Sequence, residues 1–263
     1  MKNLSKQLKK ALPVVMEATR KASPILIRKF GRVKKLSMKQ NAGLVTEADH
    51  ESERIILRIL QKKFPHDHFI AEETGAHSGQ NDFCWHIDPL DGTTNFVHGF
   101  PFFCISIGLT HNDKPVLGVI HHPTTNNTYW AYYGGGAYKN KDRIRVSKIG
   151  KLNEALLTTG FSYRHREHLR DEMGSIARVI HGARGIRRTG SAALDLAFVS
   201  AGHFDGFWER GLSSWDLCAG LAILLEAGGT YSTLKGKPYN FSKVDVLATN
   251  GLIHTQLIDI LNR

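Results

Sequence analysis

The segment that most restricts the fold of this chain runs from Trp85 to Phe96 and reads WHIDPLDGTTNF. In it an apolar strand passes directly into two acidic residues, Asp88 and Asp91, with a proline between them. Proline cannot continue a helix, and it restricts the preceding residue to extended geometry. We therefore expect the strand to end here with both carboxylates at its carboxyl edge, where open α/β sheets bind their ligands.

The residues after these acids favour a turn into a helix that can bind an anion. Gly92 has no side chain to prevent close approach, and Thr93 and Thr94 suit a helix start. The backbone N–H groups at such a helix start are unpaired and attract phosphate. Two carboxylates beside a phosphate would repel it unless cations lie between them. Because hard oxygen ligands in a hydrated site favour Mg²⁺, the segment predicts a magnesium and phosphate site.

Two further acidic positions support this prediction. Taken alone, two aspartates around a turn more often cap the following helix than carry chemistry. However, Glu72 follows the apolar residues 68–71, and Asp216 begins an unusually apolar helical segment, where burial of an unpaired carboxylate is costly. Such a set could hold two Mg²⁺ ions about 3.5–4 Å apart, an arrangement suited to phosphate hydrolysis. The four candidate ligands are Glu72, Asp88, Asp91 and Asp216.

No other catalytic nucleophile stands out in the sequence. The three cysteines lie in apolar segments without the spacing of a zinc site or a disulfide framework: Cys84, Cys104 and Cys218. The chain has no nucleophile elbow, phosphate-binding loop or aspartyl-phosphate motif. Metal-assisted hydrolysis without a covalent enzyme intermediate is therefore the predicted chemistry.

Charge and composition set the remaining limits. The 263 residues carry a net charge of +11 and contain no long linker, which predicts one domain of residues 1–263 with lobes of about 1–150 and 151–263. The positive charge suits phosphate esters, nucleic acid or a membrane surface without choosing among them. No apolar segment is long enough to span a bilayer, so we expect a cytoplasmic protein that does not bind membranes. Arginines are densest at Arg164, Arg166, Arg170, Arg184, Arg187 and Arg188.

The pattern of apolar residues predicts a layered α/β architecture. Helices are expected at residues 4–25, broken or kinked by Pro13 and Pro24, and at 46–63, capped by Thr46. Further helices are expected at 167–180, 191–200, 215–227 and the C-terminal end. Strands are expected at 68–71, 83–88, 102–110, 115–121, 128–132, 156–159, 204–209 and 246–249.

Several separated blocks resemble the inositol monophosphatase family, in particular its bacterial members known as extragenic suppressor proteins. The blocks are residues 85–98, 215–220 followed by Gly228–Gly229, Glu72–Glu73, and 44–46 followed by Asp49. The resemblance covers nearly the whole chain. It implies the layered α/β/α/β/α sandwich of the sugar phosphatases, two or three Mg²⁺ ions in each active site, inhibition by Li⁺, and a homodimer.

The resemblance also assigns the metal ligands. It implies that Glu72, Asp88 and the Leu90 carbonyl hold one Mg²⁺, that Asp88, Asp91 and Asp216 hold a second, and that a third and weaker ion shares Glu72.

Catalytic and phosphate-binding roles follow from the same resemblance. It implies that Asp49 orients the Thr93 hydroxyl, and that Thr93 and Glu72 position and deprotonate a metal-activated water. The backbone N–H groups of Gly92 and Thr93 would hold the phosphate. Many relatives carry Asp where this chain has Gly43. Residues that hydrogen-bond to metal ligands change metal affinity by about 10–100-fold. We therefore expect Gly43 to weaken the support of the metal ligands without abolishing activity.

Substrate contacts are implied for a later segment. The residues that resemble the family's polyol-binding part are Asp91, Gly190, Ser191, Ala192 and Glu209. The alternatives are an ordinary strand-to-helix turn at 188–193 and a surface acid at Glu209 paired with Arg210.

The resemblance predicts hydrolysis of myo-inositol monophosphate to myo-inositol and phosphate. One alternative is a related phosphatase of fructose 1,6-bisphosphate or of 3′-phosphoadenosine 5′-phosphate. Another is a regulator that binds RNA or the transcription machinery through its basic surface, with incidental phosphatase activity.

Overall fold

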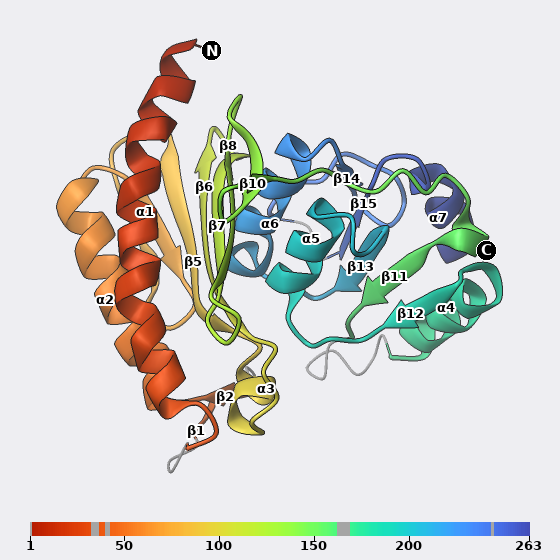
Figure 1. Cartoon of the computed structure of the whole chain (residues 1–263), viewed down its shortest axis with the longest axis horizontal. Coiled ribbons are helices and arrows are strands. Elements are labelled where there is room, and N and C mark those ends of the chain that lie inside the picture. The colour runs from red at the N-terminus through yellow and green to blue at the C-terminus, as the bar shows by residue number, and fades with distance from the viewer. Residues whose placement is uncertain (1, 33–36, 40–42, 162–168, 243–244) are drawn as a thin grey trace.

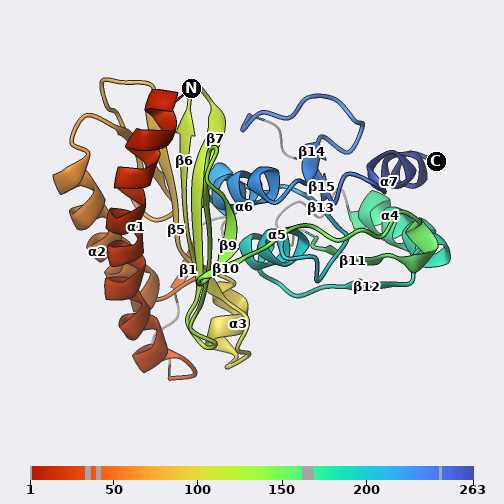
Figure 2. The same cartoon turned by 45° about the horizontal axis from the view of Figure 1, so that its top comes forward.

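The computed structural model describes residues 2–32, 37–39, 43–161, 169–242 and 245–263, which form five layers (Figure 1). Helices α1 (Lys2–Lys29) and α2 (Glu47–Lys63) cover one face of an eight-stranded sheet. Helices α5 (Ala192–Ser200) and α6 (Ser214–Glu226) lie between this sheet and a five-stranded sheet, in both views (Figure 2). Helices α4 (Leu169–Gly182) and α7 (His254–Leu261) form the outer layer. The predicted α/β/α/β/α sandwich is confirmed.

The larger sheet has the strand order β10-β9-β8-β7-β6-β5-β3-β4. All of its neighbouring strands are antiparallel except β3 and β5, which are parallel. Its strands are β3 (His68–Ala71), β4 (Gly75–His77), β5 (Phe83–Asp91), β6 (Cys104–His111), β7 (Lys114–His122), β8 (Asn127–Tyr132), β9 (Gly136–Lys139) and β10 (Asp142–Arg143).

The smaller sheet has the order β12-β11-β13-β15-β14, with β11 parallel to both of its neighbours. Its strands are β11 (Leu156–Thr159), β12 (Gly185–Arg187), β13 (Gly206–Arg210), β14 (Thr230–Ser232) and β15 (Asp245–Thr249). The short pair β1 (Ser37–Lys39) and β2 (Gly43–Val45), the 3-10 helix η1 (Leu152–Glu154) and α3 (Thr93–Val97) complete the fold.

Helix α1 runs through both prolines without interruption, so the prediction that they would break it was wrong. Both proline side chains are exposed, whereas Val15, Ala22 and Leu26 on the opposite face are fully buried. The backbone carbonyl groups that lose a partner at a proline therefore lie on the solvent side, where water can bind them. Burial of the apolar face is sufficient to keep the helix continuous.

The other predicted elements are present, with small shifts at their ends. Thr46 caps the start of α2 as predicted, and it forms a capping box with Asp49, which lies in the first turn of the helix. The first two residues of the helix predicted at 167–180 lie outside the described residues, and so do Arg164 and Arg166. The single domain with a lobe boundary near residue 150 remains a prediction. Among the described residues, no helix is long and apolar enough to cross a membrane.

Candidate active site

The central strand β5 carries the acids through a bulge. It pairs in parallel with β3 up to Ala71 and Ile87, and the Glu72 N–H then donates to the Ile87 carbonyl over 3.1 Å. Its pairing with β6 shifts register between Asp88 and Asp91. The strand therefore continues past its predicted end at residue 88 to Asp91, because a bulge allows the chain to pass Pro89, which has no N–H to donate. Both carboxylates lie at its carboxyl end, as expected.

Three of the predicted ligands meet in space. Carboxylate oxygens of Asp88, Asp91 and Asp216 all lie within 4.8 Å of one another. Asp216 reaches this point from the first turn of α6, where its Oδ2 accepts the Ser213 N–H over 2.6 Å. Two acids from one strand thus meet a third from a helix more than one hundred residues later in the chain.

The fourth acid, Glu72, lies beside this group. It directly follows β3, so the parallel pairing of β3 with β5 places it next to Asp88. Its charge raises the pKa of Asp49, Asp88 and Asp91, which shows that it is close to all three. The structure therefore places the whole predicted acidic set in one region, while binding of a metal by these residues remains a prediction.

Burial and mutual repulsion dominate the electrostatics of the site. Burial raises the pKa of Asp88 well above its usual range, and the charges of Glu72, Asp91 and Asp216 raise it further. Burial likewise raises the pKa of Asp91 to about 6. Buried carboxylates so close together resist ionisation unless a positive charge lies among them. Such a cluster is a suitable binding site for a hard divalent cation, which would compensate their negative charge.

Asp91 also connects the larger sheet to helix α5. Its Oδ2 accepts the Ser191 hydroxyl over 2.6 Å and the Ala193 N–H over 2.8 Å. Ser191 is the N-cap of α5, and Gly190 before it has the positive φ of 88° that glycine tolerates. The predicted substrate segment at Gly190, Ser191 and Ala192 therefore lies directly against a predicted metal ligand.

The predicted phosphate turn follows the bulge. Gly92 has φ of 90° and is the N-cap of α3. A Cβ there would lie 3.0 Å from the Phe102 carbonyl oxygen, so a larger residue would be strained.

The Thr93 hydroxyl has two acceptors, the Leu90 carbonyl at 3.1 Å and Asp49 Oδ1 at 3.4 Å. Asp49 Oδ2 is held by the Thr46 N–H at 2.8 Å and the Thr46 hydroxyl at 2.6 Å. Burial raises the pKa of Asp49.

Glu209 faces the interior and not Arg210. Its carboxylate packs on the backbone of Gly160, where an added Cβ would overlap it. Burial raises the pKa of Glu209, and the charge of Asp195 adds to this, whereas Arg188 lowers it. In the part of the chain that the structure describes, no ion pair joins Glu209 to Arg210, so the alternative of a paired surface acid receives no support.

Sequence reasoning missed a set of residues that hold the substrate segment in place. Asn95 Nδ2 donates to the Thr189 carbonyl over 2.9 Å and to the Phe102 carbonyl over 2.7 Å. The Thr189 hydroxyl donates to Asp195 Oδ1 over 2.7 Å. Asp195 is 1% exposed, and burial raises its pKa to about 8. The available signal was an acid in the apolar helical segment 192–199.

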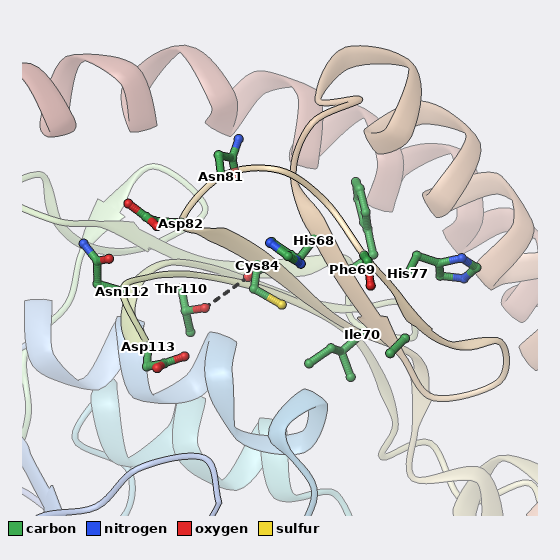
Figure 3. Close-up of a pocket in the computed structure, with 12 residues that line it drawn as sticks. His68, Phe69, Ile70, His77, Asn81, Asp82, Cys84, Thr110, Asn112 and Asp113 are labelled. Atoms are coloured by element: carbon green, nitrogen blue, oxygen red, sulfur yellow. Dashed lines mark hydrogen bonds between the residues drawn. The ribbon is translucent and has the colours of Figure 1, made fainter.

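A separate pocket of about 380 Å³ lies near the start of β5 (Figure 3). Cys84 and His68 line it, and the Thr110 hydroxyl donates to the Cys84 carbonyl over 3.3 Å. Burial raises the pKa of the Cys84 thiol to about 11, so the thiol is protonated at neutral pH. This agrees with the expectation that the cysteines do not act as nucleophiles.

Comparison with known proteins agrees with this fold. The model of the inositol monophosphatase family matches residues 7–263. The chain is 42% identical over 253 residues to an inositol-1-monophosphatase of Synechocystis sp., covering 95% of this chain and 88% of that relative. It is 36% identical over 258 residues to a protein of Aquifex aeolicus named fructose-1,6-bisphosphatase/inositol-1-monophosphatase, covering 97% of each.

The solved structures lead to the same result. The crystal structure of the extragenic suppressor protein suhB from Bartonella henselae matches with a TM-score of 0.92 and 38% identity, covering 97% of this chain and 99% of that one. The chain is thus a phosphatase, a hydrolase of phosphoric monoesters. It belongs to the inositol monophosphatase family, as the resemblance predicted.

Proposed function

We propose that the chain hydrolyses myo-inositol monophosphate to myo-inositol and phosphate, with two or three Mg²⁺ ions. The observation that carries the proposal is the convergence of carboxylate oxygens within 4.8 Å, directly before a glycine turn into α3. The residues that would hold the ions are Glu72, Asp88, Asp91, Asp216 and the carbonyl of Leu90. The names of relatives, such as the inositol-1-monophosphatase of Synechocystis sp., support the choice of substrate.

Mg²⁺ bound among these carboxylates would supply positive charge against the phosphate oxygens. The residues of the chain bind and orient the reactants. The N–H groups of Gly92 and Thr93 hold the phosphate, and Glu72 accepts a proton from the attacking water. The Thr93 hydroxyl orients this water, and its own proton is directed toward Asp49 Oδ1 or the Leu90 carbonyl. Direct attack requires no covalent intermediate with the enzyme.

The polyol would lie between the ends of β5, α5 and β13. We assign its hydroxyl groups to Asp91, Glu209 and the backbone at 190–192. Glu209 suits this role because it is held against Gly160 inside the smaller sheet and has no ion pair with Arg210 among the described residues. A side chain held in one position gives directional hydrogen bonds at a low entropic cost.

A substrate panel tests the assignment. We expect kcat/KM to be highest for inositol 1-phosphate, compared with fructose 1,6-bisphosphate and 3′-phosphoadenosine 5′-phosphate. Glu209→Gln should raise KM for inositol 1-phosphate and leave hydrolysis of p-nitrophenyl phosphate, which lacks polyol hydroxyls, nearly unchanged. A higher kcat/KM for fructose 1,6-bisphosphate would instead favour the fructose-1,6-bisphosphatase activity named for the Aquifex aeolicus relative.

We also propose that the protein forms a homodimer through α4. Leu169, Met173 and Ile180 on this helix are 41%, 40% and 59% exposed, although helices usually expose polar side chains. Light scattering of the wild type and of Met173→Lys would test this interface, with a dimer expected for the wild type and a larger monomer fraction for the variant. A monomeric wild type would refute it.

The alternative from another functional class is a regulator that binds RNA or the transcription machinery. It is motivated by the exposed Arg184, Arg187 and Arg188 and by the suppressor protein among the structural relatives. RNA binding that weakens steeply with salt and in an Arg184→Ala/Arg187→Ala variant would support it. Inhibition by Li⁺ and a cytoplasmic location likewise remain predictions.

A further inference from the structure

Helix α2 turns a polar face toward the acidic site. Asp49, Ser52 and Glu53 are 1%, 0% and 1% exposed, and their spacing places them on one side of the helix. A helix that packs on a sheet normally buries apolar side chains there, as α2 does with Ile56 and Leu60. Buried polar side chains are retained only where they have hydrogen-bond partners, so the partners of this face indicate what it does.

Glu53 binds the backbone that follows Glu72. Its Oε2 accepts the Glu73 N–H over 2.9 Å, and its Oε1 accepts the Thr74 N–H over 2.9 Å. Each carboxylate oxygen therefore fixes one peptide group immediately after a predicted metal ligand. Hydrogen bonds to an ionised carboxylate are stronger than neutral ones and hold their donors in a defined place.

Ser52 binds the other side of the site. Its hydroxyl donates to the Pro89 carbonyl over 3.0 Å. Pro89 lies inside the bulge of β5, between the side chain of Asp88 and the carbonyl of Leu90, where regular pairing with β6 is interrupted. The hydroxyl of Ser52 thus supplies a partner to a carbonyl inside the bulge.

From these contacts we infer that Ser52 and Glu53 are positioning residues that set the spacing between Glu72, directly after β3, and Asp88 on β5. Two adjacent residues of one rigid helix hold the two backbone segments from which these carboxylates project. Neither residue needs to contact the metal or the substrate to do this. The inference rests on the proposed metal-binding function of the acidic cluster.

The expected effect is on metal affinity. Loss of an outer partner of a ligand typically lowers metal affinity by about 10–100-fold. In Glu53→Gln, the amide NH₂ would face one of the two N–H donors and lose that bond, so a loss of this size is expected. Ser52→Ala removes a single hydrogen bond and should weaken Mg²⁺ binding by about two- to tenfold.

The matched control is Glu51→Gln on the same helix. Glu51 is 37% exposed at its side chain and pairs with Lys29 over 2.7 Å, away from the acidic cluster. This variant removes the same charge from α2 without changing the contacts of the bulge or of the turn after β3. Its Mg²⁺ affinity should equal that of the wild type.

Calorimetric titration of metal-free protein with Mg²⁺ measures these affinities without using activity. We expect Glu53→Gln and Ser52→Ala to bind more weakly than the wild type and Glu51→Gln. The Mg²⁺ concentration for half-maximal activity should rise by similar factors, whereas kcat at saturating Mg²⁺ stays within a few-fold. A merely structural role would lower thermal stability without moving the metal affinity.

Two outcomes separate failure of this inference from failure of the proposed function. Mg²⁺ binding by the wild type with unchanged affinity in both variants would overturn the positioning role alone. Absence of Mg²⁺ binding by the wild type would overturn the metal site itself and the positioning role with it. If Glu53→Gln does not fold, the comparison of Ser52→Ala with the wild type decides the question.

Discussion

Replacing Asp91 by asparagine should change how the stability of the metal-free protein depends on pH. The pKa of Asp91 is about 6 in the folded protein, compared with an ordinary value of 3.8. The folded protein therefore holds this proton over a pH range in which the unfolded chain has lost it. Stability contributed by the site falls as pH rises from about 3.8 to about 6 and is constant above that.

The size of the effect follows from the shift in pKa. A rise of about 2 in pKa lowers the free energy of unfolding by about 3 kcal/mol once Asp91 is ionised in both states. At pH 5 roughly half of this loss of stability has occurred. Asparagine does not ionise, and its amide oxygen can accept the bonds from Ser191 and Ala193 that now go to Oδ2. Without metal, Asp91→Asn should thus be more stable than the wild type by up to about 3 kcal/mol at pH 7.5, and by about half as much at pH 5.

Urea unfolding followed by tryptophan fluorescence, in EDTA and in excess Mg²⁺, measures this difference. Mg²⁺ should reverse the order of stability, because a ligand that binds only the folded wild type stabilises it by mass action. A difference between the two proteins that does not change with pH would refute the electrostatic reasoning. Equal stabilisation of both proteins by Mg²⁺ would refute the role of Asp91 as a ligand.

Substitutions at three other positions give further tests. Thr93→Ala should lower kcat by about 10²–10⁴-fold with little change in KM, whereas Thr93→Ser retains the hydroxyl and should keep most of the activity. Steady-state kinetics measures both variants, and an alanine variant with wild-type kcat would contradict the role of the hydroxyl. Ser191→Ala removes the cap of α5, so urea unfolding should show a loss of about 1–2 kcal/mol, and no loss would mean that the cap is unimportant. Burial lowers the pKa of His121 to about 4, so stability that is present above pH 6.5 should be lost as pH falls toward 4. His121→Gln should flatten this decline, measured by urea unfolding over that pH range, and an unchanged slope would contradict it.

The sequence was most informative where a local signal and the packing agree. Helix α2 and strand β11 begin and end close to the predicted positions. A threonine cap marks the start of α2, and Gly160 directly follows β11. The acids of the site were also visible, since a carboxylate at the end of an apolar strand is unusual. Helix α1 differs because burial of its long apolar face outweighs the local effect of two exposed prolines.

What the sequence could not provide depends on contacts between distant segments. The bulge that carries β5 past Pro89 exists because of its pairing with β6, which no local pattern reveals. The roles of Asn95 and Asp195 depend on their meeting at Thr189, and those of Ser52 and Glu53 depend on which strands α2 covers. The spacing of Asp49, Ser52 and Glu53 does form a polar stripe on the predicted helix, but such a stripe ordinarily faces solvent.

The most direct test of the central claim is anomalous diffraction from crystals grown with Mn²⁺ in place of Mg²⁺. Because Mn²⁺ prefers the same oxygen ligands, an anomalous peak should lie between the carboxylates of Asp88, Asp91 and Asp216. Crystals of active protein that show no peak among these carboxylates, with Mn²⁺ bound elsewhere, would contradict it.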